Sequence, residues 1–169
     1  MIIIGIDTAI RKTGYGVLEM SGTNVLKVLD CGVIANSPKL SHSECLRRLS
    51  GGIRELVETY HPDAAAIEGA FVSRNIKTAM ILSLARGAVI ARLAEFAVPV
   101  YEYSPKTAKR AATGNGEASK EQVAALIAAF GKLNIQDIPN DSTDALALAL
   151  CHGSTALKAG GTRLLPKPL

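Results

Sequence analysis

The N-terminal part of the chain alternates between apolar runs and short polar turns, a pattern that predicts a three-stranded meander. The first run, Ile2–Asp7, is apolar until it ends on a carboxylate, which is typical of a central strand covered on both faces. Two further strand-like runs follow, at Tyr15–Met20 and Val25–Ile34. The polar turn Ser21–Asn24 separates these two runs and indicates an antiparallel hairpin.

The apolar period then changes from that of a strand to that of a helix and back. Ser41–Tyr60 places its leucines, isoleucine and valine on one helical stripe. Ala64–Gly69 is a short apolar run whose last large residue, like that of the first run, is an acid. A long alanine-rich helix is predicted over Lys77–Phe96, and Val100–Tyr103 has the pattern of a fifth strand.

The remaining chain has helical patterns. Ser104–Thr113 is a basic helical segment, and Ser119 begins the next helix with Gln122 at the capping-box position. A final helix is predicted to begin near Asp141. This order of elements predicts an α/β fold, namely a five-stranded mixed sheet with helices on both faces.

Composition narrows the class of protein. The chain has 169 residues, of which 48% are hydrophobic and 20% charged, so we expect one globular domain over residues 1–156 and a flexible tail over 157–169. The net charge of +4 permits a polyanionic partner such as nucleic acid. The three cysteines form neither a disulfide framework nor a zinc pattern, and the apolar segment Ala79–Val100 is broken by charges. We therefore expect a cytoplasmic protein that does not enter a membrane.

Four acidic residues stand out as candidate catalytic groups. Asp7 and Glu68 end buried strands, and Asp141 and Asp144 lie three residues apart at the start of the last helix, so they share a face. Functional sites of open α/β sheets gather beyond the carboxyl ends of the strands, where these acids would meet. Four like charges repel one another unless a cation neutralises them, and hard oxygen ligands suit Mg²⁺ and Mn²⁺. Two such ions can promote phosphodiester hydrolysis.

Each acid also has an ordinary structural interpretation. An acid at a strand end is commonly a turn former, and Asp141 is suited to be a helix N-cap. Asp144 in the first turn of a helix interacts favourably with the helix dipole. The combination of two strand-end acids with an Asp-x-x-Asp helix start favours the functional interpretation over these single explanations.

The order of motifs resembles one nuclease family. The segments GID…R-x-T-G-Y-G-V, AIEGAF…RN, EY…K and D-x-x-D-A-L-A-L-A-x-C-H, spread between Ile2 and His152, resemble the bacterial Holliday-junction resolvases of the RuvC type. The resemblance implies an RNase H-like fold, a homodimer, and paired symmetric nicks in four-way DNA junctions that leave 5′-phosphate and 3′-hydroxyl ends. It further implies two Mg²⁺ ions per site, for which Mn²⁺ substitutes, and the branch-migration proteins RuvA and RuvB as partners.

The resemblance also assigns roles to individual residues. Asp7, Glu68, Asp141 and Asp144 match the catalytic, metal-binding acids of the family. Phe71 matches an aromatic residue that stacks on an unpaired base at the crossover, a contact that tolerates any base. Lys109 and Lys120 match basic residues near the scissile phosphate. Together with neighbouring polar residues they make up the predicted DNA-binding set: Phe71, Arg74, Asn75, Lys106, Lys109, Arg110 and Lys120.

One departure from the family pattern concerns the turn after the first strand. The family usually has Asp-Pro-Gly there, whereas this chain has Asp7-Thr8-Ala9. The change removes a φ-restricted residue and a permissive one, so the turn must adopt a conformation that alanine tolerates.

Other functions remain open from the sequence. The hairpin GIDTAIRKTGYGV also resembles the first phosphate-binding hairpin of actin- and hexokinase-type phosphotransferases, which need two lobes around a nucleotide. A junction-binding protein without cleavage is a second alternative. A third is another RNase H-like nuclease that cuts RNA–DNA hybrids or other branched nucleic acid.

Overall fold

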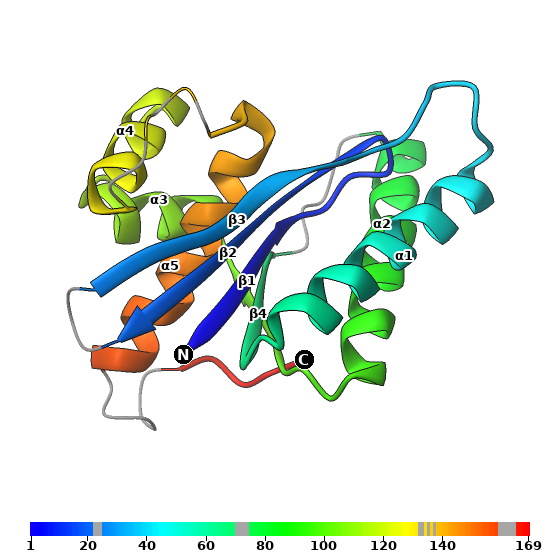
Figure 1. Ribbon diagram of the computed structural model, residues 1–169. Helices are drawn as coiled ribbons and strands as arrows, with labels where there is room; N and C mark the ends of the chain where they lie inside the picture. Colours follow the sequence, from blue (N-terminus) through cyan, green and yellow to red (C-terminus); the bar gives the residue numbers. More distant parts are fainter. Residues whose placement is uncertain (22–24, 70–74, 132–133, 135, 137, 159–164) are drawn as a thin grey trace.

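The computed structural model describes residues 1–21, 25–69, 75–131, 134, 136, 138–158 and 165–169. Its centre is a twisted five-stranded sheet with the strand order β3-β2-β1-β4-β5 (Figure 1). The first three strands are antiparallel neighbours and β1, β4 and β5 are parallel, which confirms the predicted meander and mixed sheet. The strands are β1 (Ile2–Asp7), β2 (Lys12–Ser21), β3 (Val25–Ala35), β4 (Ala64–Glu68) and β5 (Val100–Tyr103).

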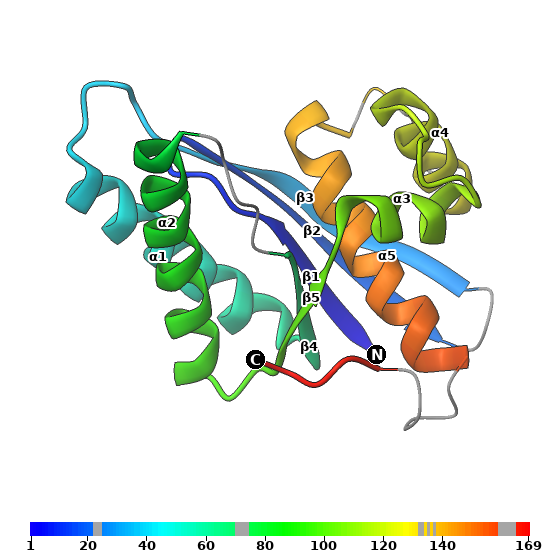
Figure 2. The same cartoon turned by 180° about the vertical axis from the view of Figure 1, so that it is seen from behind.

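Helices cover both faces of this sheet, as the sequence predicts. In Figures 1 and 2, helices lie on both faces, so the strands run between two helical layers. The first layer contains α1 (His42–Tyr60) and α2 (Ile76–Glu95). The second contains α3 (Pro105–Thr113), α4 (Lys120–Gly131) and α5 (Thr143–Lys158).

Alternation along β1 divides the interior into two cores. Ile4 and Ile6 point to one face and join a buried cluster with α1 and α2, whereas Ile3 points to the other face and packs with α5. Because both faces are covered, the strand is apolar at every position until Asp7. This explains why the sequence of β1 reads as a continuous apolar run.

Local signals set several helix boundaries. The side chain of Ser41 accepts a hydrogen bond from Glu44 N and caps α1. The predicted capping box is confirmed: Ser119 Oγ accepts from Gln122 N at 3.3 Å, and Gln122 Oε1 accepts from Ser119 N at 2.9 Å. The last helix begins at Thr143, slightly later than predicted, because a 3₁₀ turn, η2 (Asn140–Ser142), precedes it.

The C-terminal part returns to the sheet. α5 continues to Lys158, and the backbone N–H of Leu169 donates to the carbonyl of Val100 at 2.9 Å, at the start of β5. The flexibility assigned to residues 157–169 stays a prediction. Among the helices that the structure describes, none is both long and apolar enough to cross a membrane.

Candidate active site

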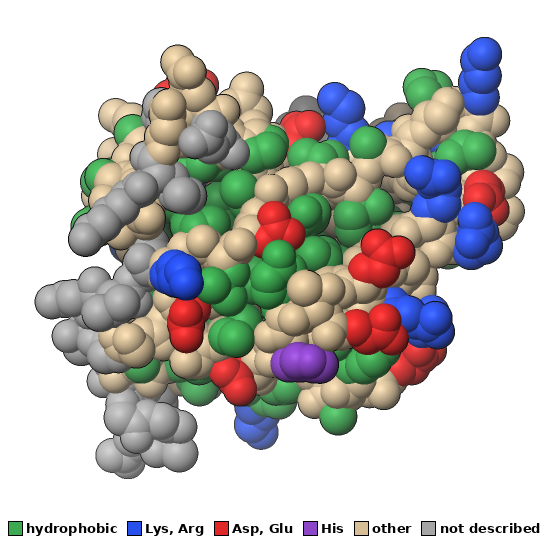
Figure 3. Space-filling model, in the orientation of Figure 1, with side chains coloured by type: hydrophobic (Ala, Val, Ile, Leu, Met, Phe, Trp, Pro, Cys, Tyr) green, Lys and Arg blue, Asp and Glu red, His purple; other side chains and the backbone are tan. Residues whose placement is uncertain are grey.

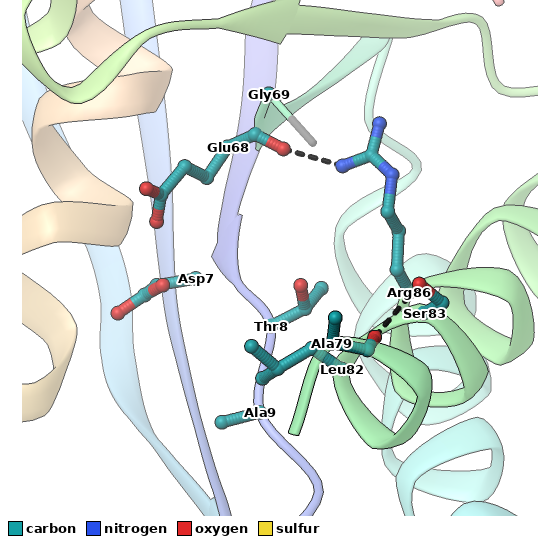
Figure 4. Close-up of a pocket in the computed structure, with 9 residues that line it drawn as sticks. All are labelled: Asp7, Thr8, Ala9, Glu68, Gly69, Ala79, Leu82, Ser83 and Arg86. Atoms are coloured by element: carbon teal, nitrogen blue, oxygen red, sulfur yellow. Dashed lines mark hydrogen bonds between the residues drawn. The ribbon is translucent and has the colours of Figure 1, made fainter. Parts of the chain in front are cut away.

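Two of the four predicted acids come together at the ends of adjacent parallel strands. Ile6 of β1 is paired with Ile67 of β4, so Asp7 and Glu68 leave the sheet side by side. Figure 4 shows the two carboxylates turned toward the same side, where α5 lies. The charge of Asp7 acts directly on Glu68. Rigid central strands therefore position both groups.

Glycines in β1 and β2 bring the other two acids close. Gly5 faces the backbone of Ala145, and a Cβ atom at Gly5 would overlap its carbonyl oxygen. Gly14, which is paired with Asp7, faces the backbone of Asp141 in the same way. The start of α5 can therefore lie directly on the sheet. As a result, Asp141 and Asp144 come within electrostatic range of Asp7.

The crowding of acids changes their protonation. Burial raises the pKa of Asp7 above its ordinary value, and the charge of Asp144 raises it further, while Lys120 lowers it. Burial also raises the pKa of Glu68, and neighbouring Asp7 adds to this effect. Both shifts indicate a partly buried site that favours an added positive charge.

Two lysines supply part of that charge. Lys120 Nζ forms an ion pair with Asp144, and Lys12 Nζ lies 3.7 Å from Asp141 Oδ2. Contact with Asp144 raises the pKa of Lys120, so this side chain is cationic at neutral pH. Lys109 and Lys120 line one hollow of about 150 Å³ together with Glu68 and Asp144. The two lysines that were predicted to bind DNA therefore lie beside two of the four acids.

The four carboxylates are ligands that suit a hard divalent cation, although they do not converge on one point. Within the described ranges, no three Asp, Glu, His or Cys side chains converge as ligands of one ion. Instead the acids are divided: Asp7 contacts Glu68, and Asp141 and Asp144 each contact a lysine. Carboxylate oxygens are the ligands that Mg²⁺ and Mn²⁺ prefer, and a cation would relieve the repulsion that raises the pKa of Asp7 and Glu68.

The unusual turn after Asp7 is held by a buried threonine. Thr13 Oγ1 accepts from the N–H of Ala9 at 3.2 Å and donates to the carbonyl of Ala9 at 2.5 Å, and the Thr13 side chain is fully buried. Ala9 is not among the described residues that have a positive φ. Alanine therefore fits this turn without backbone strain, and one hydroxyl group satisfies both polar atoms of its backbone.

The other predicted DNA contacts are distributed differently. Phe71 and Arg74 lie outside the described residues. Asn75 Oδ1 accepts from Thr78 N at 3.1 Å and caps α2. Lys106 is exposed and lies 2.6 Å from Glu117, and Arg110 is exposed on the same helix, α3. The face in Figure 3 carries acidic and basic side chains interspersed, so its described residues form no continuous basic band.

A second cavity adjoins the acids on the opposite side, toward α2. It has a volume of about 320 Å³, and Figure 4 shows Asp7, Glu68, Ser83 and Arg86 along its wall. Arg86 forms an ion pair with Glu102 of β5. Its contact with the backbone of Glu68 has no signal in the sequence.

The fold and the acidic site together define a class, the RNase H-like nucleases. Comparison with known proteins then gives the family. Residues 3–152 match the family model "Crossover junction endodeoxyribonuclease RuvC", and the chain belongs to this family of metal-dependent nucleases. Membership excludes the phosphotransferase alternative.

Individual relatives agree over most of the chain. The protein named crossover junction endodeoxyribonuclease RuvC from Roseiflexus sp. (strain RS-1) is 42% identical over 149 residues, which cover 88% of each chain. The structure of T. thermophilus RuvC in complex with Holliday junction substrate superposes with a TM-score of 0.89 at 33% identity, covering 100% of this chain and 99% of the other. The yeast mitochondrial resolvase Ydc2, at 15% identity and a TM-score of 0.66, shares the fold.

Proposed function

We propose that this chain resolves four-way DNA junctions by paired nicks, and that Asp7, Glu68, Asp141 and Asp144 form its catalytic, metal-binding centre. The observation that carries the proposal is the meeting of four acids from four elements, β1, β4, η2 and α5, at the carboxyl ends of β1 and β4. The junction as substrate follows the relative from T. thermophilus, whose structure contains a Holliday junction.

We propose Mg²⁺ as the cofactor, two ions per site, with Mn²⁺ as a substitute. When bound, such ions lower the pKa of an attacking water and stabilise charge on the phosphate oxygens. The four carboxylates would hold them. Lys120 and Lys12 would move from Asp144 and Asp141 toward phosphate groups of the DNA, because a cation that binds the carboxylates weakens both ion pairs.

The chain's own residues would orient the substrate. Lys109 and Lys120 line one hollow beside Glu68 and would hold the phosphates on either side of the cleaved bond. Lys106 and Arg110 on α3 extend this basic edge, and Asn75 begins the helix on the other side of the site. Phe71 and Arg74 complete the proposed DNA-binding set. These contacts would supply affinity that falls with salt and little sequence information.

We further propose a homodimer that forms through α2. Three large apolar side chains on this helix are exposed at four-residue spacing: Ile76, Met80 and Leu84, with exposed fractions of 76%, 64% and 52%. Residues spaced in this way form one stripe on a helix. A twofold axis through this stripe would bury it against a second copy and place two active sites for the two cuts. RuvA and RuvB as partners follow from the family resemblance, and a cytoplasmic location follows from the cysteine pattern and from the charges that break the apolar segment Ala79–Val100.

A cleavage assay tests the proposal. A labelled mobile four-way junction, a linear duplex and an RNA–DNA hybrid are incubated with the protein in Mg²⁺ and in Mn²⁺, beside the Asp7→Asn variant. We expect paired symmetric nicks in the junction alone, with 5′-phosphate ends, and none with Asp7→Asn, which should still bind. Cleavage of the hybrid instead would support the four-acid active site but show that the substrate is an RNA–DNA hybrid and not a junction. Binding without cleavage in either metal would refute the enzymatic proposal.

A further inference from the structure

Arg86 of α2 contacts the backbone of a proposed metal ligand. Its Nη1 donates to the main-chain carbonyl oxygen of Glu68, and its Nη2 forms an ion pair with Glu102 on β5. Figure 4 shows the Arg86 side chain reaching across the cavity to this oxygen, while the Glu68 carboxylate points the other way, toward Asp7. One guanidinium group therefore joins α2 to the ends of two strands.

The Glu68–Gly69 peptide group is held at both of its polar atoms. Its carbonyl accepts from Arg86, and its N–H, which belongs to Gly69, donates to the carbonyl of Tyr103 at 2.9 Å. This peptide is the last one of β4 that the structure describes before residues 70–74. Because both atoms are held, the peptide plane is held, and this restrains the backbone from which the Glu68 side chain projects.

The burial of Arg86 argues against a simple surface ion pair. Its side chain is 15% exposed, and Glu102 is 35% exposed, so both charges lose much of their hydration. Ion pairs of this kind contribute little net stability compared with apolar side chains of the same size. A charged side chain that donates to the main chain beside an active site is better explained by the geometry that it imposes.

We propose that Arg86 is a positioning residue that orients Glu68 for metal binding and so makes the active site depend on the placement of α2. The inference rests on the proposed role of Glu68. It goes beyond that role because α2 also carries the exposed stripe Ile76, Met80 and Leu84. The same helix therefore contacts the active site through Arg86 and presents the proposed dimer surface.

A matched pair of variants on one helix tests this inference. Arg86→Ala removes the contact with Glu68. Arg92→Ala removes a second α2 arginine that also has an ion pair, with Glu95, and a hydrogen bond to Ser50 Oγ at 2.9 Å, but does not contact the site. Arg86→Lys keeps a charge and part of the hydrogen-bonding capacity. If Arg86→Ala does not fold, the comparison of Arg86→Lys with Arg92→Lys decides the question.

Four quantities are measured for each variant: the melting temperature and its shift with Mn²⁺, the exchange rate of the Gly69 amide, junction affinity without metal, and the single-turnover nicking rate. For Arg86→Ala we expect a rate at least tenfold lower, faster Gly69 exchange and a smaller Mn²⁺ shift, with junction affinity within twofold of wild type. Arg86→Lys should be intermediate, and Arg92→Ala should match wild type in all but melting temperature.

Two results would overturn the inference. One is equal behaviour of Arg86→Ala and Arg92→Ala in rate and Gly69 exchange, which would make Arg86 a stabilising residue only. The other is a loss confined to junction affinity, which would make Arg86 a DNA contact. Glu68→Gln is the reference for the proposed function: if it nicks and binds Mn²⁺ like wild type, the assignment of Glu68 has failed, whatever Arg86 does to Gly69 exchange.

Discussion

The imidazole Nδ1 of His152 lies 2.9 Å from the hydroxyl oxygen of Tyr103, and both side chains are buried between α5 and β5. Tyr101 stacks on the same imidazole ring, with ring centroids 4.4 Å apart. Because Tyr103 of β5 is paired with Glu68 of β4, and His152 lies on the helix of Asp144, this bond ties that helix to the strand beside Glu68.

Because His152 is buried, its contribution to the free energy of unfolding should decrease as the pH falls from 6.5 to 4. Burial lowers the pKa of His152 from 6.5 to about 4, so the folded protein keeps the ring neutral. Well above pH 6.5 the imidazole is neutral in both the folded and the unfolded protein, so the full contribution of His152 to stability is present. Between pH 6.5 and 4 only the unfolded state becomes protonated, which lowers the free energy of unfolding by up to about 3 kcal/mol.

Denaturant unfolding at several pH values measures this effect. The double variant Tyr103→Phe/His152→Phe avoids an unpaired hydroxyl and should show a flatter dependence between pH 6.5 and 4 than wild type. His42→Gln replaces an exposed histidine at the start of α1 and should keep the wild-type slope. If the double variant kept the wild-type slope, His152 would not be the cause of the loss of stability between pH 6.5 and 4.

Because α5 and the turn before it lie directly on the sheet, adding one methyl group at Gly14 should strongly destabilise the fold. Gly14→Ala should push Asp141 and the start of α5 away, destabilise the fold by about 1–3 kcal/mol and lower the nicking rate of the folded fraction. Gly51→Ala is the control, because a Cβ atom there meets no atom within 4 Å. It should be neutral or stabilising by about 0.5–1 kcal/mol. Equal melting temperatures for both variants would contradict the packing argument.

Thr13 should be required for the turn that follows Asp7. Thr13→Val keeps the shape of the side chain but leaves the partly buried N–H and carbonyl of Ala9 without their Thr13 partner, at a cost of about 1–3 kcal/mol. Thr13→Ser keeps the hydroxyl and should retain most of the nicking rate. Ala9→Gly should not improve activity, because Ala9 does not have a positive φ. A faster Ala9→Gly variant would show instead that this turn limits the enzyme.

The sequence allowed prediction of the strands and of the acids at their ends, because buried strands are apolar runs and Asp7 and Glu68 interrupt them. It did not predict how closely α5 approaches the sheet. That depends on Gly5 and Gly14 facing a helix far along the chain, which no local pattern reveals. The same holds for Arg86, whose partners come from two different strands.

Lys120 should have opposite effects on metal binding and on cleavage. Its amine pairs with Asp144 and lowers the pKa of Asp7, so it competes with a cation for the carboxylates. In the Lys120→Met variant, half-saturation of the Mn²⁺-induced rise in melting temperature should occur at a lower Mn²⁺ concentration than in wild type. Nicking should nevertheless fall at least tenfold, because the phosphate loses its cationic contact.

Lys27→Met provides the matched control for this separation. Lys27 is exposed on β3 and is paired with Glu19, at the end of the sheet opposite Asp7, so neither Mn²⁺ binding nor the nicking rate should change by more than about twofold. Thermal unfolding with Mn²⁺ titration and single-turnover nicking at saturating metal separate the two effects. If Lys120→Met bound Mn²⁺ less tightly than wild type, Lys120 would be organising the carboxylates rather than competing for them, and the ion pair with Asp144 would belong to the working site.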